Sequence, residues 1–270
     1  MSLTNLANHL KDTGDRTGAL AAATRAVDIF QRLAAANPTQ FEPDLAVSLT
    51  SLTGLLSETG DETGALAAAT RVVEIYERLT PSHPARFEPL LADGLQNLSI
   101  ALSQSEPAAA LKAARRTVET YERLAAANPA RFEPDLAMSL FNLANRLSIT
   151  GDPTGTRATA QRAVAIYERL AATNPARFES DLAFSLMAQA TAAARIGDLK
   201  LASASSARAL PLWRSLARAA PAAHGGRLLR TLRDSAGIFA AAGLQQEADA
   251  TNAELTAILE AVEARNEGED

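Results

Sequence analysis

The 270-residue sequence contains no cysteine, which excludes disulfides, thiolate metal sites and cysteine nucleophiles. No apolar run approaches the roughly 20 residues that a membrane-spanning helix needs. The first residues show no basic segment followed by an apolar one, so no secretory signal is visible and we expect a cytoplasmic protein. Aromatic residues make up only 4% of the chain, whereas hydrophobic residues, mainly alanine and leucine, make up 47%. This composition favours helices that pack through small side chains.

Patterns typical of catalysis and of metal binding are also missing. The three histidines, His9, His83 and His224, are far apart and have no metal-ligand spacing to each other or to acids. There is no phosphate-binding glycine loop, nucleophile elbow or zinc-protease motif. No pair of acids stands alone in an apolar stretch, as acid–base catalysis would need. We therefore expect no enzymatic activity, no metal and no cofactor, and the net charge of −5 argues against nucleic acid as a partner.

What the sequence does contain is a repeat of about 46 residues. The phrase F-E-P-D-L-A begins at Phe41 and returns, unchanged or nearly so, at Phe87, Phe132 and Phe178, at steps of 46, 45 and 46 residues. A T-G-D phrase and a Y-E-R-L phrase follow the same rhythm. A fixed period of this length indicates a stacked array in which each unit buries its apolar face against its neighbours. We expect the recurring phenylalanines to fill the seam between units.

One copy of the repeat predicts a pair of antiparallel helices. Pro134 suits the first turn of a helix, and leucines at three- and four-residue spacing follow it, as on one apolar face. Gly151 can take the left-handed conformation that ends a helix, and Asp152 can cap the next one. Asn174-Pro175 then stops the second helix.

Counting these pairs predicts one all-α domain over residues 1–265, followed by a disordered acidic tail over 266–270. The first pair begins inside its first helix, so we expect either a piece of a longer protein or an open end that docks on something. The expected units are residues 1–38, 39–84, 85–129, 130–175, 176–221 and 222–264.

These residues resemble the tetratricopeptide repeat family. Gly14, Gly60 and Gly151 align with the family's turn glycine, and Ala19 and Ala65 fall on its characteristic alanine. The long period and phrases such as T-N-L-A and F-N-L-A are similar to the subclass typified by kinesin light chain, here of bacterial, actinobacterial-looking type. The resemblance implies a right-handed α-solenoid of six helix pairs, with the extra length at the end of the second helix and in the following loop.

In the resembled family the first helix of each pair lines a concave groove. Asparagine recurs on these helices at positions outside the apolar packing face, although it is a mediocre helix former. Its amide can both donate hydrogen bonds to the backbone of a peptide and accept them from it. The alternative is that these amides bond to neighbouring helices or face water. Phe141, Met187 and Phe184 either add an apolar patch to the groove or pack between repeats. The candidate peptide-binding residues are Asn5, Asn8, Ser51, Asn97, Asn142, Asn145, Phe141 and Met187.

A second regular row consists of arginines and lies on the second helix of the pairs. Acids follow its arginines three residues later, and further arginines follow those acids at the favourable four-residue spacing. The row is interpreted as a solvated, charge-laced convex face, or alternatively as an arginine ladder for phosphate or an acidic partner. Its members are Arg25, Arg71, Arg116, Arg162 and Arg208.

The function predicted first is a non-catalytic protein–protein interaction scaffold that binds a peptide or a partner helix in the concave groove. A second hypothesis, from the same resemblance, is a regulatory or sensor arm of a larger signalling ATPase or caspase-like protease. A third is self-assembly through the open N-terminal end. The expected partner is a protein or peptide, with no nucleic acid and no membrane involved.

Overall fold

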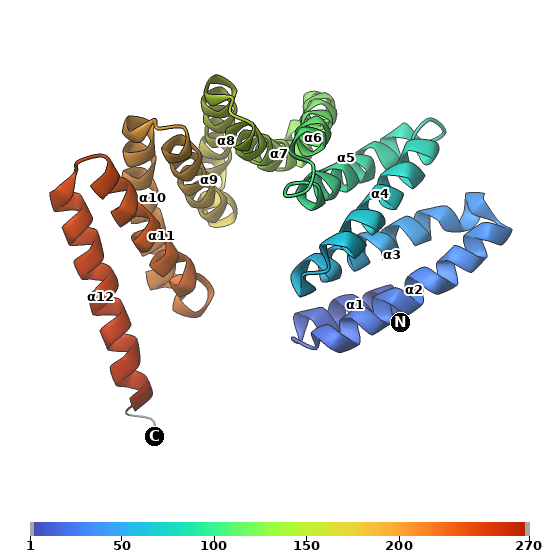
Figure 1. Cartoon of the computed structure of the whole chain (residues 1–270), viewed down its shortest axis with the longest axis horizontal. Helices are drawn as coiled ribbons and strands as arrows, with labels where there is room; N and C mark the ends of the chain where they lie inside the picture. Colours follow the sequence, from blue (N-terminus) through green and yellow to red (C-terminus); the bar gives the residue numbers. More distant parts are fainter. Residues whose placement is uncertain (1–2, 268–270) are drawn as a thin grey trace. The chain divides into compact units, whose positions relative to one another are not determined.

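The computed structural model describes residues 3–267, with side chains to residue 263, and this part of the chain contains helices and short turns but no strand. Figure 1 shows consecutive helices running antiparallel, as the repeat predicts. The helices are α1 Leu3–Asp12, α2 Arg16–Ala36, α3 Pro38–Thr59, α4 Glu62–Leu79, α5 Pro84–Ala101, α6 Pro107–Ala127, α7 Pro129–Ile149, α8 Pro153–Thr173, α9 Pro175–Arg195, α10 Leu199–Ala219, α11 Pro221–Ala241 and α12 Gln245–Glu267.

The chain divides into two compact units, residues 1–132 and 133–270. In the first unit each helix from α1 to α5 packs on the next one along the chain. In the second unit α8 packs on α9, α9 on α10, α10 on α11 and α11 on α12. Within each unit, alternate helices also touch, α1 with α3 and α9 with α11. This helix-pair packing confirms the predicted all-α repeat fold.

The turns inside the pairs form as the T-G-D phrase predicts. Gly151 has a φ of 79°, in the left-handed region that favours glycine. The carboxylate of Asp152 then accepts a 2.8 Å hydrogen bond from the backbone N–H of Gly155, which caps α8. Asp15 and Asp61 cap α2 and α4 in the same way.

The first helix of each pair begins earlier than the sequence analysis placed it. α7 starts at Pro129, so Pro134 lies in its second turn, and the prediction for Pro134 was wrong. Pro43 and Pro89 hold the same internal position in α3 and α5. The helices before and after Asn128 are separated by that residue alone. The extra length of the repeat therefore lies in longer helices, not in a longer loop.

The cores consist of small and aliphatic side chains, as the composition predicts. In the second unit Ala183, Leu186, Leu210 and Leu232 are buried together around Trp213. The recurring phenylalanines Phe87, Phe132 and Phe178 are buried, with 2%, 8% and 7% of their surface exposed, and Phe41 is partly buried. They belong to the packing between helices, in line with the seam role expected for them.

The prediction that a disordered tail begins at residue 266 was wrong, because α12 extends to Glu267 and residues 266 and 267 belong to the helix. Residues 268–270 lie outside the described residues.

Candidate functional site

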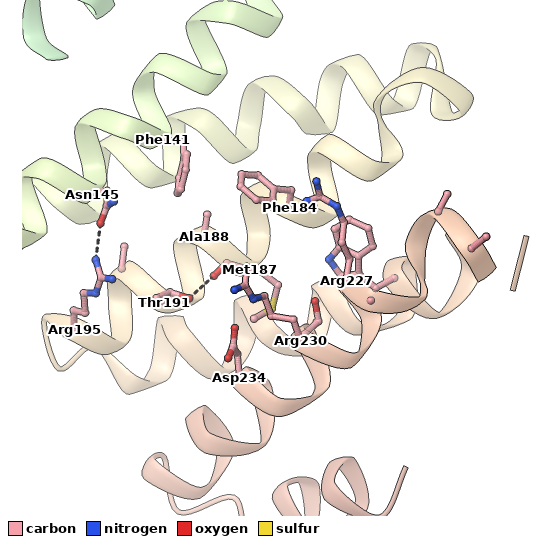
Figure 2. A pocket seen from close by; sticks show the side chains of 16 residues that line it. Phe141, Asn145, Phe184, Met187, Ala188, Thr191, Arg195, Arg227, Arg230 and Asp234 are labelled. Carbon is pink, nitrogen blue, oxygen red and sulfur yellow. Dashed lines mark hydrogen bonds between the residues drawn. The ribbon is translucent and has the colours of Figure 1, made fainter. Parts of the chain in front are cut away.

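A groove of about 630 Å³ opens in the second unit, across the first helices of three successive pairs. α7 contributes Phe141 and Asn145, and α9 contributes Phe184. α11 supplies Arg227 and Arg230 on the opposite side, as Figure 2 shows. The groove thus lies on the helix face that the sequence analysis selected for partner binding.

Helical periodicity explains why these side chains face the groove. On α9, Phe184, Ala188, Thr191 and Arg195 recur at three- and four-residue spacing and line the hollow. The neighbouring stripe on the same helix contains Ala183, Leu186, Ala190 and Ala193, and all four of those residues are buried in the core. One stripe of α9 therefore packs in the core, and the neighbouring stripe lines the groove where a ligand can bind.

The floor of the groove is apolar and largely aromatic. The rings of Phe141 and Phe184 meet edge to face, with their centroids 5.4 Å apart. Met187 and Trp213 line the groove from below and are only 9% and 2% exposed. Trp213 is the one tryptophan of the sequence, so its fluorescence reports on this groove alone. Such a floor can accept an apolar side chain of a ligand.

The rim of the groove carries positive charge. Arg195, Arg227 and Arg230 line it, with Asp234 as the single acid among the lining residues. The Arg227 guanidinium lies 5.7 Å from the centroid of the Phe184 ring and 5.8 Å from that of Trp213, within cation–π range. Three guanidinium groups against one carboxylate leave a local formal charge of +2, in a chain whose net charge is −5.

A smaller hollow of about 370 Å³ continues from the groove, sharing Phe184, Trp213 and Arg227 with it. Asp181 lines this hollow, and burial raises the pKa of its carboxyl above the ordinary value, while Arg177 and Arg227 act in the opposite direction. The indole N–H of Trp213 is buried without a hydrogen-bond partner in the described part of the chain. The hollow therefore has room and polar groups for water or for a ligand atom.

Asp181 also acts on a neighbouring tyrosine. Burial raises the pKa of the Tyr167 hydroxyl first, and the charges of Asp181 and Asp135 raise it further. The Tyr167 hydroxyl donates a 3.2 Å hydrogen bond to the backbone carbonyl of Pro134. This tyrosine consequently stays protonated and serves as a structural donor that ties α8 to α7.

The structure brings some of the predicted binding residues together and not others. Phe141, Met187 and Asn145 line the groove, whereas the half-buried Asn142 on α7 is not among its lining residues. Asn145 accepts a hydrogen bond of 2.5 Å from the Arg195 guanidinium. Its amide is thus engaged with a neighbouring helix, which is the alternative weighed for this row.

The remaining members of the row lie in the first unit, on other helices. Asn5 and Asn8 are exposed on α1, Ser51 is half-buried on α3, and Asn97 is half-buried on α5. A role in peptide binding for these four residues stays a prediction.

Sequence reasoning missed the arginines of the groove. Arg195 ends α9, and Arg227 and Arg230 stand in the R-L-L-R-T-L-R run of α11, where each one reads as an ordinary surface cation. The available signal was the run itself, because Arg227, Arg230 and Arg233 recur at three-residue spacing without acids between them.

The arginine row of the second helices is held by ion pairs and hydrogen bonds between repeats. Arg116 pairs with Glu77 at 2.7 Å, and Arg208 pairs with Glu168. Arg71 donates to the Gln31 side chain at 3.2 Å. Each of these partners lies about one repeat earlier in the sequence. Arg25 and Arg162 are exposed on α2 and α8.

The expected four-residue pairs along the second helices are replaced by contacts within the repeat. Arg78 pairs with Glu42 at 2.7 Å, and Arg169 pairs with Glu133 at 2.7 Å, so the glutamate of F-E-P is the acid that is used. Within the described residues Glu74, the acid four residues before Arg78, forms no ion pair with it, because the packed helix pair places Glu42 within reach of the Arg78 guanidinium. Because glutamates of the same chain already form ion pairs with several arginines of this face, the face is poorly suited to bind an acidic partner.

Two searches of the described residues gave negative results. In residues 3–267 no three histidine or acidic side chains gather as a metal site would require. No helix in that range has the length and the apolar character to cross a bilayer.

Solved structures similar to this chain are repeat proteins of the tetratricopeptide type. BtubC from P. vanneervenii is 20% identical with a TM-score of 0.63, over 90% of this chain and 91% of that one. A Podosopora anserina kinesin light chain-like protein with TPR-like repeats is 19% identical with a TM-score of 0.61, over 80% and 95% of the two chains. No protein-family model and no curated protein matches the sequence.

A third similar structure is a signal transduction ATPase with a tetratricopeptide repeat sensor from Pyrococcus horikoshii. It is 14% identical with a TM-score of 0.69, and the match covers 96% of this chain but 35% of the ATPase chain. These likenesses show that the chain has the tetratricopeptide-like repeat fold.

Proposed function

We propose that this chain is a non-catalytic interaction module and that its groove across α7, α9 and α11 binds a peptide or a helix of a partner protein. The observation that carries the proposal is the combination of the open hollow with an aromatic floor and a cationic rim. An apolar anchor surrounded by polar groups that fix orientation is the usual anatomy of a recognition site. The fold supplies the rigid helices on which such a site is built.

The charge of the rim selects the chemistry of the ligand. Arg227 and Arg230 form no ion pair within residues 3–263, in contrast to Arg116 and Arg208 on the second helices. A guanidinium binds a carboxylate through two parallel hydrogen bonds, which gives both strength and direction. The ligand that fits best therefore has an aromatic or aliphatic side chain next to one or more carboxylates.

A second candidate function is a regulatory sensor arm of a larger signalling protein. The likeness to the sensor-bearing ATPase from Pyrococcus horikoshii, which extends over nearly all of this chain, supports it. The two functions are compatible, because a sensor arm also needs a ligand site. The genomic reading frame tests this candidate: a nucleotide-binding or protease domain in the same frame supports it, and its absence would leave only the free-standing module.

Selection from a displayed library of random peptides tests the proposed function. The whole chain and a variant with Arg195, Arg227 and Arg230 changed to Ala would be used side by side, after circular dichroism has shown equal helix content. A variant with Arg116 and Arg208 changed to Ala serves as the control, because these arginines lie on second helices and do not line the groove. We expect the natural chain and the control to enrich peptides with carboxylates beside an apolar residue. Enrichment of the same peptides by the triple variant would contradict the proposal.

A further inference from the structure

We propose that the groove accepts the C-terminal end of α12 from a second copy of this chain. The inference rests on the proposed function, since it names an occupant for the same groove. It differs from assembly through the N-terminal end, because it uses α12 as the ligand and α7, α9 and α11 as the receptor. Three observations support it: an apolar face exposed on α12, the acidity of the segment that carries it, and the arginines of the groove, of which Arg227 and Arg230 form no ion pair within residues 3–263.

The last described helix exposes two large apolar side chains to solvent. Leu259 and Val262 are 39% and 48% exposed, although Leu255 and Ile258 on the same helix pack against the core. The three-residue spacing places Leu259 and Val262 next to each other on one helical face. Glu260 and Glu263 follow each of them by one residue, are exposed, and form no ion pair within residues 3–263. This face thus presents a short apolar ridge bordered by carboxylates.

The segment as a whole is the chemical complement of the groove. Residues 259–270 contain five acids and one arginine. The groove offers Phe141 and Phe184 for the apolar ridge and Arg195, Arg227 and Arg230 for the carboxylates. Opposite charges across a contact speed association and favour one orientation over others. The same sequence therefore carries both halves of a complementary pair.

In its own chain α12 packs on the core side of α11, away from the groove residues of that helix. Ala248 and Thr251 of α12 are buried, and Ala248, Leu255 and Ile258 pack into the core cluster that contains Leu232 of α11. The groove side of α11 carries Arg227, Arg230 and Asp234, away from that core stripe. Bringing Leu259 to Arg227 within one molecule would require α12 to leave its packing. A second copy can instead offer its intact α12, so the contact is heterologous and builds chains or closed rings.

Sedimentation velocity of the full chain, over a hundredfold range of concentration, tests the inference. We expect the sedimentation coefficient of the natural chain to rise with concentration and to fall back when salt is raised to 1 M. A variant with Glu260→Arg and Glu263→Arg, and separately one with Arg227→Glu and Arg230→Glu, should remain monomeric at concentrations where the natural chain associates. These residues are exposed, so circular dichroism should show unchanged helix content.

Mixing the two charge-reversed variants provides the sharpest control. Each variant alone has lost complementarity. In the mixture the arginine-bearing α12 of one variant matches the glutamate-bearing groove of the other, and the unchanged α12 and the unchanged groove match as in the natural chain. Association should therefore return as assemblies that contain both variants. Failure of the mixture to associate, or a natural chain that stays monomeric throughout, would overturn the inference. If library peptides bind the groove while the natural chain remains monomeric, the proposed function stands and only the self-docking is wrong.

Discussion

The amide oxygen of Asn145 accepts a 2.5 Å hydrogen bond from the Arg195 guanidinium, and this contact joins α7 to α9 at one end of the groove. The two residues lie one repeat apart, so the bond depends on how successive pairs pack. Asn145 therefore holds a cation in place at the rim through its amide oxygen. This relationship gives the asparagine a role that can be tested independently of the arginines.

Two substitutions at Asn145 should have opposite effects on a carboxylate ligand. Asn145→Asp places a negative charge against Arg195 and neutralises it, so affinity for an acidic peptide should fall about tenfold, the effect of losing roughly 1.4 kcal/mol of binding free energy. Asn145→Ala releases the guanidinium without neutralising it, so affinity should change by less than about threefold. Isothermal titration with a library-selected acidic peptide measures both. An Asn145→Ala loss as large as that of Asn145→Asp would show that the amide itself binds the ligand.

Two glycine-to-alanine substitutions should shift stability in opposite directions. Gly151 adopts a φ of 79°, and an alanine there is forced into the left-handed region at a cost of about 1–2 kcal/mol. Gly237 lies inside α11, where an added Cβ meets no atom within 4 Å, so alanine should stabilise the fold by about 0.5–1 kcal/mol. Urea unfolding followed by circular dichroism measures both changes. Equal changes in the free energy of unfolding of the two variants would contradict the left-handed conformation assigned to Gly151.

The partly buried carboxyl of Asp181 should make part of the free energy of unfolding depend on pH. Because burial raises its pKa in the folded state, the folded protein holds this proton more tightly than the unfolded chain does. The contribution of Asp181 is therefore most favourable below the ordinary value of 3.8 and is lost as pH rises through the folded pKa.

Asp181→Asn removes this dependence. The free energy of unfolding of the variant, relative to that of the natural chain, should rise as the pH increases from the ordinary pKa of 3.8 to the raised pKa of Asp181 in the folded state. Above the raised pKa the difference between the two proteins should stay constant. Denaturant titrations at a series of pH values give the difference. A natural chain that gains stability relative to the variant as pH rises would contradict the direction of the shift.

The parts of the fold that are governed by local sequence could be predicted, and the parts governed by packing between repeats could not. Gly151 and Asp152 form the expected turn and cap because both effects act within four residues. Pro134 was misplaced because proline is tolerated at a helix start, and nothing local distinguishes that position from the second turn. The N-P phrase after the preceding helix was the better start signal.

The residues of the groove divide in the same way, into those that local sequence could predict and those that depend on packing between repeats. Phe141 could be named because a large apolar residue outside the leucine stripe of its helix is conspicuous in the sequence, whereas Met187 lines the groove and is also part of the buried core. Arg195 and Arg230 could not be named, since the groove assembles them from helices that are distant in the sequence. The pairing of Arg169 with Glu133 was likewise hidden, because it crosses from one helix of the pair to the other.

The fluorescence of Trp213, titrated with a library-selected acidic peptide, tests the central claim most directly, because this tryptophan lines the groove and is the one in the chain. The account predicts a saturable change in emission for the natural chain and for the variant with Arg116 and Arg208 changed to Ala. The same titration should leave the emission of the variant lacking Arg195, Arg227 and Arg230 unchanged. Binding of the peptide, seen by calorimetry, without any response of Trp213 would place the site elsewhere and contradict the account.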